Sequence, residues 1–162
     1  MTVRLTVDRA AWMAHLRSTA AAYGDGLVPV VKGNGYGFGR PLLHDLLTGD
    51  LLARDTATGD PGTGDTGTGD AATRPGMVCV GTVHEVHDVP AASTPVVLTP
   101  TLTAPGDSRA VLTVGSSDHV HALAEWHGSV IVKLDSSMSR YGATPDELGP
   151  PLAAVTGAGL QL

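Results

Sequence analysis

The chain has 162 residues, a formal net charge of −6 and no basic cluster, so it is not expected to bind nucleic acid. Its single Cys79 excludes an internal disulfide and favours a reducing, cytoplasmic compartment. The sequence has no run of about 18 apolar residues, so we do not expect it to insert into a membrane. It also has no charged-then-apolar leader, so we do not expect secretion.

Three elements are expected in the first third of the chain. Residues 8–23 are strong helix formers, and Trp12, Leu16 and Ala20 recur on one face. The apolar run 28–31 predicts a buried strand that ends at Lys32, and four glycines fall in the next seven residues. Pro41 is a typical start signal and predicts a second helix over 41–54.

Residues 55–74 differ in composition from the rest of the chain. The triplet TGD occurs three times in this tract, at 58–60, 63–65 and 68–70, and almost nothing in it can be buried. The composition predicts a disordered surface insertion. Its spaced aspartates raise calcium binding as an alternative, but no glutamate or larger ligand set accompanies them.

From Met77 onward, apolar runs alternate with helical patterns. Strands are expected from Met77 and over 94–98, 109–114 and 129–134, and residues 159–162 begin a further strand. Helices are expected over 82–89, from the N-cap residues at 116–118, and from Thr144, where Pro150 and Pro151 would bend or divide the helix.

This alternation predicts an α/β fold, with a parallel sheet covered on both faces by outer helices. A doubly wound sheet and a barrel both remain open at this point. The glycines after Lys32 fall at every second position and lack the spacing of a dinucleotide-binding turn. Six alternations would form about strands 1 to 6 of a (β/α)8 TIM-type barrel.

Two motifs resemble those of a known family. The segment VVKGNGYGFGR, residues 30–40, resembles the V-V-K-A-N-A-Y-G-H-G signature of the alanine racemase family, which are fold-type III pyridoxal-phosphate (PLP) enzymes. The segment VKLDSSMSRYG, residues 132–142, resembles the family's K-x-D-[TS]-G-M-x-R-x-G segment after the fifth barrel strand. MVCVGTVHEV, residues 77–86, is similar to the family's second-strand segment, which leads to a Glu. The resemblance implies that residues 1–162 are the N-terminal part of a PLP-binding barrel, without the family's C-terminal β-domain.

The first motif implies the cofactor and one catalytic group. Lys32 matches the lysine that forms a Schiff base with PLP and serves as one of two acid/base groups at the substrate Cα. Tyr36 matches the tyrosine that binds the PLP phosphate. Burial of Lys32 at the strand end would favour the neutral, nucleophilic amine, while an ordinary strand-end lysine reaching solvent is the alternative.

The second motif implies substrate contacts. Arg140 matches an active-site arginine near the cofactor and the substrate carboxylate, which a guanidinium can hold through two hydrogen bonds. Met138 matches a methionine whose backbone amide lines the substrate site, although a core methionine is equally consistent with the sequence. Lys133 matches a lysine that some members carry carbamylated, and the alternative is an ion pair with Asp135, two residues away on the same strand face.

The departures from the family pattern limit the function. Alanine is replaced by Gly33 and Gly35, which is expected to loosen the turn, and the family's later barrel strands and β-domain have no counterpart. We expect a PLP-dependent amino-acid racemase (an isomerase of D-alanine biosynthesis) that acts on a small amino acid and whose full-length relatives form homodimers. The chain alone is expected to be inactive or nearly so. A PLP-carrier or decarboxylase-type barrel and a non-catalytic fragment are the alternatives, and the histidines are not expected to form a metal site.

Overall fold

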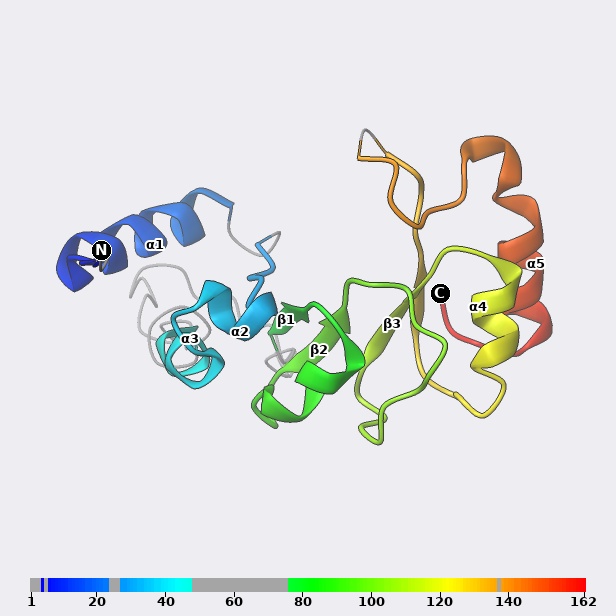
Figure 1. Cartoon of the computed structure of the whole chain (residues 1–162), viewed down its shortest axis with the longest axis horizontal. Coiled ribbons are helices and arrows are strands. Elements are labelled where there is room, and N and C mark those ends of the chain that lie inside the picture. Colours follow the sequence, from blue (N-terminus) through cyan, green and yellow to red (C-terminus); the bar gives the residue numbers. More distant parts are fainter. Residues whose placement is uncertain (1–3, 5, 24–26, 48–75, 137) are drawn as a thin grey trace, which may run out of the picture. The chain divides into compact units, whose positions relative to one another are not determined.

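A computed structural model describes residues 4, 6–23, 27–47, 76–136 and 138–162 (Figure 1). The chain divides into two compact units, Met1–Leu27 with Asp45–Arg74, and Val28–His44 with Pro75–Leu162. The expected insertion at 55–74 and the second half of the helix expected over 41–54 lie outside the described residues. No helix in the described ranges is long and apolar enough to cross a membrane.

The first unit contains the helix expected at the N-terminus. Helix α1 spans Arg9–Tyr23, and Asp8 precedes it. The Asp8 carboxylate accepts a hydrogen bond from the Ala11 amide at 3.1 Å, which satisfies one of the unpaired donors of the first turn. Met13 is buried, whereas Trp12 and Leu16 are half-buried. The prediction of this helix is therefore confirmed.

The second unit contains a parallel four-stranded sheet. Its strands are β1 (Met77–Val80), β2 (Thr94–Val97), β3 (Val111–Val114) and β4 (Val130–Val132), in the order β1-β2-β3-β4. Every neighbouring pair is parallel, because each connection crosses back before the next strand starts. These four strands lie where the sequence predicts them.

The first and last expected strands are reduced to single bridges. Val30 forms a parallel bridge with Cys79 beside β1, and Gln161 forms one with Ser129 beside β4. Pro29 lacks an amide hydrogen, so residues 28–31 offer fewer donors to a ladder. Two backbone hydrogen bonds join residues 28–31 to β1. The Cys79 amide donates to Pro29 O and the Val31 amide donates to Cys79 O, both at 2.8 Å. The prediction of a full strand over 28–31 is wrong, whereas the bridge at Gln161 is consistent with a further strand that begins at 159–162.

Short helices, two of them 3-10 helices, lie before, between and after the strands. They are α3 (Arg40–Leu46), the 3-10 helix η3 (Val83–Asp88), α4 (Ser117–Ala122), the 3-10 turn η4 (Pro145–Glu147) and α5 (Gly149–Gly157). Ser116 caps α4 by accepting from the His119 amide. The helix expected from Thr144 is divided as predicted, because Pro150 and Pro151 occupy the first turn of α5, where no amide donor is required.

One face of the sheet is more deeply buried than the other. Val80, Val97, Leu112 and Val114 share one face by register and are 0% exposed. Helix η3 packs against β1 and β2, and α4 packs against β3 and α5; α4 and α5 lie side by side in Figure 1. We infer that these helices cover the buried face.

The opposite face of the sheet is only partly covered. Cys79, Val96 and Thr113 on this face are buried, but Met77 is 51% exposed and Ile131 is 45% exposed. The strands are continuously apolar, which predicts that both faces of the sheet are covered. This prediction is wrong for the second face at Met77 and Ile131. Burial also raises the pKa of the Cys79 thiol, which keeps it protonated.

Candidate functional site

Lys32 begins a left-handed turn at the carboxyl end of residues 28–31. This turn, labelled α2 (Lys32–Tyr36), has φ angles of 62° at Gly33, 55° at Asn34 and 63° at Gly35, and Tyr36 follows at 54°. Left-handed backbone is unfavourable for residues with a Cβ atom and routine for glycine. The glycines at 33 and 35 therefore permit a specific left-handed conformation, and the expectation that they loosen the turn stays a prediction.

Backbone hydrogen bonds close this turn. The Gly35 amide donates to Val31 O at 3.1 Å, and the Gly39 amide donates to Asn34 O at 2.9 Å. A Cβ atom at Gly35 would lie 2.8 Å from a methyl carbon of Leu43 in α3, so glycine also allows this close approach. The turn is consequently held from both of its ends.

The side chains of Lys32 and Tyr36 are exposed on this turn. Tyr36 is 61% exposed, and Lys32 also belongs to the exposed residues. The expected burial of Lys32 is therefore wrong in the described part of the chain. Its amine and the Tyr36 phenol are both accessible to a ligand.

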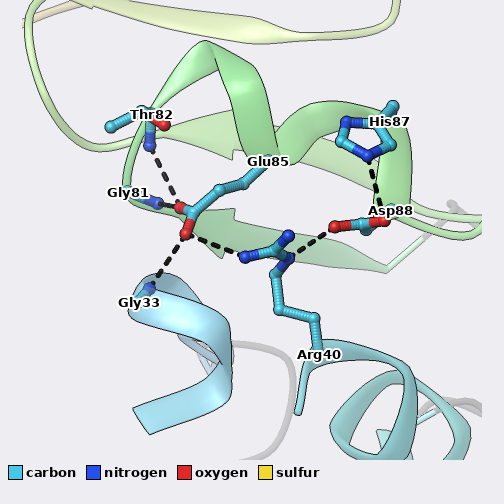
Figure 2. Close-up of polar contacts among 7 residues, drawn as sticks. All are labelled: Gly33, Arg40, Gly81, Thr82, Glu85, His87 and Asp88. Carbon is cyan, nitrogen blue, oxygen red and sulfur yellow. Dashed lines mark hydrogen bonds and ion pairs between the residues drawn. The ribbon is translucent and has the colours of Figure 1, made fainter. Parts of the chain in front are cut away.

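A half-buried carboxylate anchors the turn to the sheet. Glu85 in η3 accepts four hydrogen bonds (Figure 2), from the Gly33 amide at 3.0 Å, the Gly81 amide at 2.6 Å, the Thr82 amide at 3.2 Å and Arg40 Nη1 at 3.3 Å. Its side chain is 12% exposed. One carboxylate therefore links the Lys32 turn, the start of α3 and the end of β1.

The same network continues through Arg40. Arg40 Nε donates to Asp88 Oδ2 at 2.5 Å, and the other oxygen of Asp88 lies 3.2 Å from His87 Nε2 (Figure 2). The guanidinium thus bridges two carboxylates of η3. Sequence reasoning found Glu85 only as part of a resemblance and assigned no role to Arg40 or Asp88. The position of Arg40 at the end of the glycine motif was the sequence feature that could have indicated a structural role for it.

The environment of Glu85 stabilises its ionised form. Burial raises the pKa of this carboxyl group, but hydrogen bonds from the Gly81, Thr82 and Gly33 amides and the charge of Arg40 outweigh burial, so the pKa lies below its ordinary value. A carboxyl group with a lowered folded-state pKa stabilises the fold above its unfolded-state pKa. This stabilisation is lost as the pH falls through the folded-state value.

Glu85→Gln is therefore expected to be destabilising at neutral pH and progressively less so in acid. The difference in unfolding free energy between the wild type and Glu85→Gln should narrow as the pH falls below about 4.5, the ordinary glutamate value. Urea unfolding followed by circular dichroism over pH 3–7 (roughly the range in which carboxyl groups titrate) measures this difference. Glu125→Gln, at an exposed position, removes the same charge and is the control. A constant difference for Glu85→Gln would contradict the assignment.

The second motif forms a closed loop after β4. The Ala143 amide donates to Lys133 O at 2.9 Å, and the Asp135 amide donates to Ala143 O at 2.8 Å. Met138, at the tip of the loop, is 62% exposed, and Arg140 is also exposed. The core alternative for Met138 is therefore wrong in the described part of the chain.

Lys133 lies at the base of this loop and is half-buried. No ion pair within 4.0 Å joins Lys133 and Asp135, although the structure describes both residues, so that alternative is not supported. Asp135 Oδ1 is buried and has no hydrogen-bond partner. The chain contains only two lysines, Lys32 and Lys133, and each lies in one of the two motifs.

The two motifs lie at the same edge of the sheet but are not in contact. Lys32 and Lys133 each follow a parallel segment at its carboxyl end, one beside β1 and the other at the end of β4. Four strand spacings separate residues 28–31 from β4, which corresponds to roughly 19 Å along a sheet. No hydrogen bond or ion pair connects the side chains of the two motifs in the described ranges. A strongly curved sheet would be needed to bring both to one ligand.

Comparison with known proteins supports the fold alone. No protein-family model and no curated protein matches the sequence. Among solved structures, an alanine racemase from Clostridium difficile 630 is similar, with a TM-score of 0.54 and 16% sequence identity over 90% of this chain. The chain spans 36% of the length of that racemase chain. The resemblance to alanine racemase is thus confirmed at the level of fold, as an α/β structure with a four-stranded parallel sheet consistent with part of that barrel.

Proposed function

We propose that this chain forms the part of a PLP-dependent amino-acid racemase barrel that carries the cofactor-attachment lysine. The observation that carries the proposal is the position of Lys32. It lies at the carboxyl edge of a parallel sheet, on a closed left-handed turn, with an exposed side chain. Ligands of α/β folds bind at this edge, because the loops after the strands converge there.

The chemistry of the exposed side chains fits PLP. Lys32 offers a primary amine to the cofactor aldehyde, and Tyr36, on the same turn, offers a phenol that can donate a hydrogen bond to phosphate. Arg140 offers a guanidinium to the substrate carboxylate, and the backbone at Met138 lines the same loop. Half-buried Lys133 would support this loop, either as an ammonium or, after carbamylation, as an anion.

In this assignment Lys32 has two successive roles. It would hold the cofactor through its amine, and as a free amine it would move a proton at one face of the substrate Cα. PLP, when bound, supplies a conjugated ring that takes up the electron pair left at that carbon. Racemisation also needs a proton-transferring group on the opposite face.

The remaining components follow from the same proposal. The sheet would be part of a TIM-type barrel, in which curvature brings the Lys32 turn and the Arg140 loop toward one cofactor. The opposite-face group would come from another segment or from a second subunit of a homodimer. This chain by itself is therefore expected to bind PLP and not to racemise alanine.

Reductive trapping tests the proposal directly. The chain is incubated with PLP, reduced with borohydride and digested, and the modified peptide is identified by mass spectrometry. Because the chain has two lysines, the label can form only at Lys32, at Lys133 or at the terminal amine. We expect it predominantly at Lys32, with saturable dependence on PLP and weaker labelling by pyridoxal, which lacks the phosphate. Equal labelling of both lysines, or labelling without saturation, would contradict a specific site.

A further inference from the structure

The two oxygens of the Glu85 carboxylate hold two different segments. Oε1 accepts from the Gly33 amide and from Arg40, whereas Oε2 accepts from the amides of Gly81 and Thr82. The Gly33 amide belongs to the turn, and the Gly81 amide lies directly after β1. The rigid carboxylate therefore sets the distance between the turn and the end of the sheet (Figure 2).

The contact at Gly33 acts immediately next to Lys32. The Gly33 nitrogen is part of the peptide group that follows Lys32, so its hydrogen bond restrains the orientation of the Lys32 backbone. A Cβ atom at Gly81 would lie 3.2 Å from Lys32 Cβ and 2.9 Å from Glu85 Oε2. Lys32, Gly81 and Glu85 thus meet at one point, and a Cβ atom at 81 would displace the Glu85 carboxylate or Lys32.

The turn needs such an anchor. Asn34 and Tyr36 adopt left-handed backbone, which residues with a Cβ atom avoid. A conformation of this kind persists when surrounding contacts outweigh its strain. Glu85 is suited to supply one, because hydrogen bonds to an ionised carboxylate are stronger than neutral ones. Arg40, fixed in turn by Asp88, keeps that carboxylate in place and compensates its charge.

We propose that Glu85 is a positioning residue, which orients Lys32 through the Gly33 amide and through its bridge to Gly81. This inference depends on the proposed function for its consequence, since it concerns the availability of Lys32 to the cofactor. Glu85 does not touch the substrate in this scheme. Preorganisation of the amine lowers the entropic cost of forming the bond to the ligand.

The test compares Glu85→Gln with Asp88→Asn by reductive trapping at a series of PLP concentrations. Both changes remove one negative charge from the same network, but only the first replaces a carboxylate oxygen of Glu85 with an NH2 group. The oxygen that remains is expected to stay with the two amides of Gly81 and Thr82, so the Gly33 amide loses its acceptor. We expect Glu85→Gln to raise the half-saturating PLP concentration at Lys32 by about fivefold, the effect of one lost hydrogen bond, and Asp88→Asn to raise it less than about twofold. Labelling of Lys133 in the same molecules is the internal reference and should not change.

A second measurement keeps the inference testable without PLP. Amide hydrogen exchange of Gly33, followed by nuclear magnetic resonance, should be slow in the wild type and at least about fivefold faster in Glu85→Gln. If Glu85→Gln fails to fold, Glu85→Asp replaces it, because it keeps the charge but is one methylene too short to reach both segments. An unchanged Gly33 exchange rate and unchanged Lys32 labelling would overturn the role of Glu85. Absence of Lys32 labelling in the wild type, with Gly33 protected by Glu85, would instead overturn the proposed function.

Discussion

Lys32→Ala is expected to abolish reductive trapping of PLP at the turn, whereas Lys133→Ala should leave that labelling within about twofold of the wild type. The amine is the reacting group, so its removal eliminates the bond that borohydride reduces, and no other lysine lies on the turn. Lys133 follows β4, roughly 19 Å away along the sheet, and cannot replace it. The measurement is the intact mass of the reduced protein, together with the absorbance of the bound cofactor.

Lys133→Ala is the matched control for this experiment. It removes the other lysine of the chain and leaves the turn unchanged, so the two variants together identify the reacting amine. Circular dichroism of both variants verifies that the fold is retained. Full labelling of Lys32→Ala with complete loss in Lys133→Ala would place the cofactor on the β4 loop and refute the assignment of Lys32.

Gly35→Ala is expected to lower the free energy of unfolding by about 2–5 kcal/mol. Gly35 has a φ of 63°, and left-handed backbone costs a residue with a Cβ atom about 1–2 kcal/mol. The new Cβ atom would also lie 2.8 Å from Leu43 in α3, and overpacking of this kind typically costs about 1–3 kcal/mol. Chemical unfolding followed by circular dichroism measures the loss of stability, and trapping at Lys32 should weaken with it.

Gly33→Ala separates the two contributions. Its φ of 62° matches that of Gly35, but a Cβ atom at this position would meet nothing within 4 Å. It is therefore expected to cost only the conformational part, about 1–2 kcal/mol. Equal stability of Gly35→Ala and Gly33→Ala would show that the close approach of α3 to the turn does not add to the loss of stability. If neither variant lost stability, the left-handed conformation of the turn would be wrong.

Several elements were predictable because their causes are local. The helix at Arg9–Tyr23 follows from residue propensity and an aspartate at its start, and the four strands follow from short apolar runs between turn residues. The division before α5 follows from Pro150 and Pro151, which restrict their own backbone. Lys32 could be selected as a site residue because an apolar run ends there at a glycine-rich turn.

Other features depend on contacts between residues far apart in the chain. The handedness of the Lys32 turn was not predictable, because glycine permits both signs of φ and the neighbours decide between them. The bridge from Glu85 to Gly33 joins residues 52 positions apart, and no periodicity within either segment indicates it. Exposure of Met77 and Ile131 depends on which elements cover the second face of the sheet.

The sequence by itself determined the α/β class, the parallel order of the strands and the position of Lys32, since these depend on hydrophobic pattern, turn chemistry and the direction of the chain. Only the tertiary structure decided how Lys32 is held. A left-handed turn, a half-buried carboxylate shared by four donors, and an arginine between two carboxylates arise when three separate segments meet at the end of β1. Their hydrogen bonds need partners supplied by different parts of the chain, and folding alone brings those partners together.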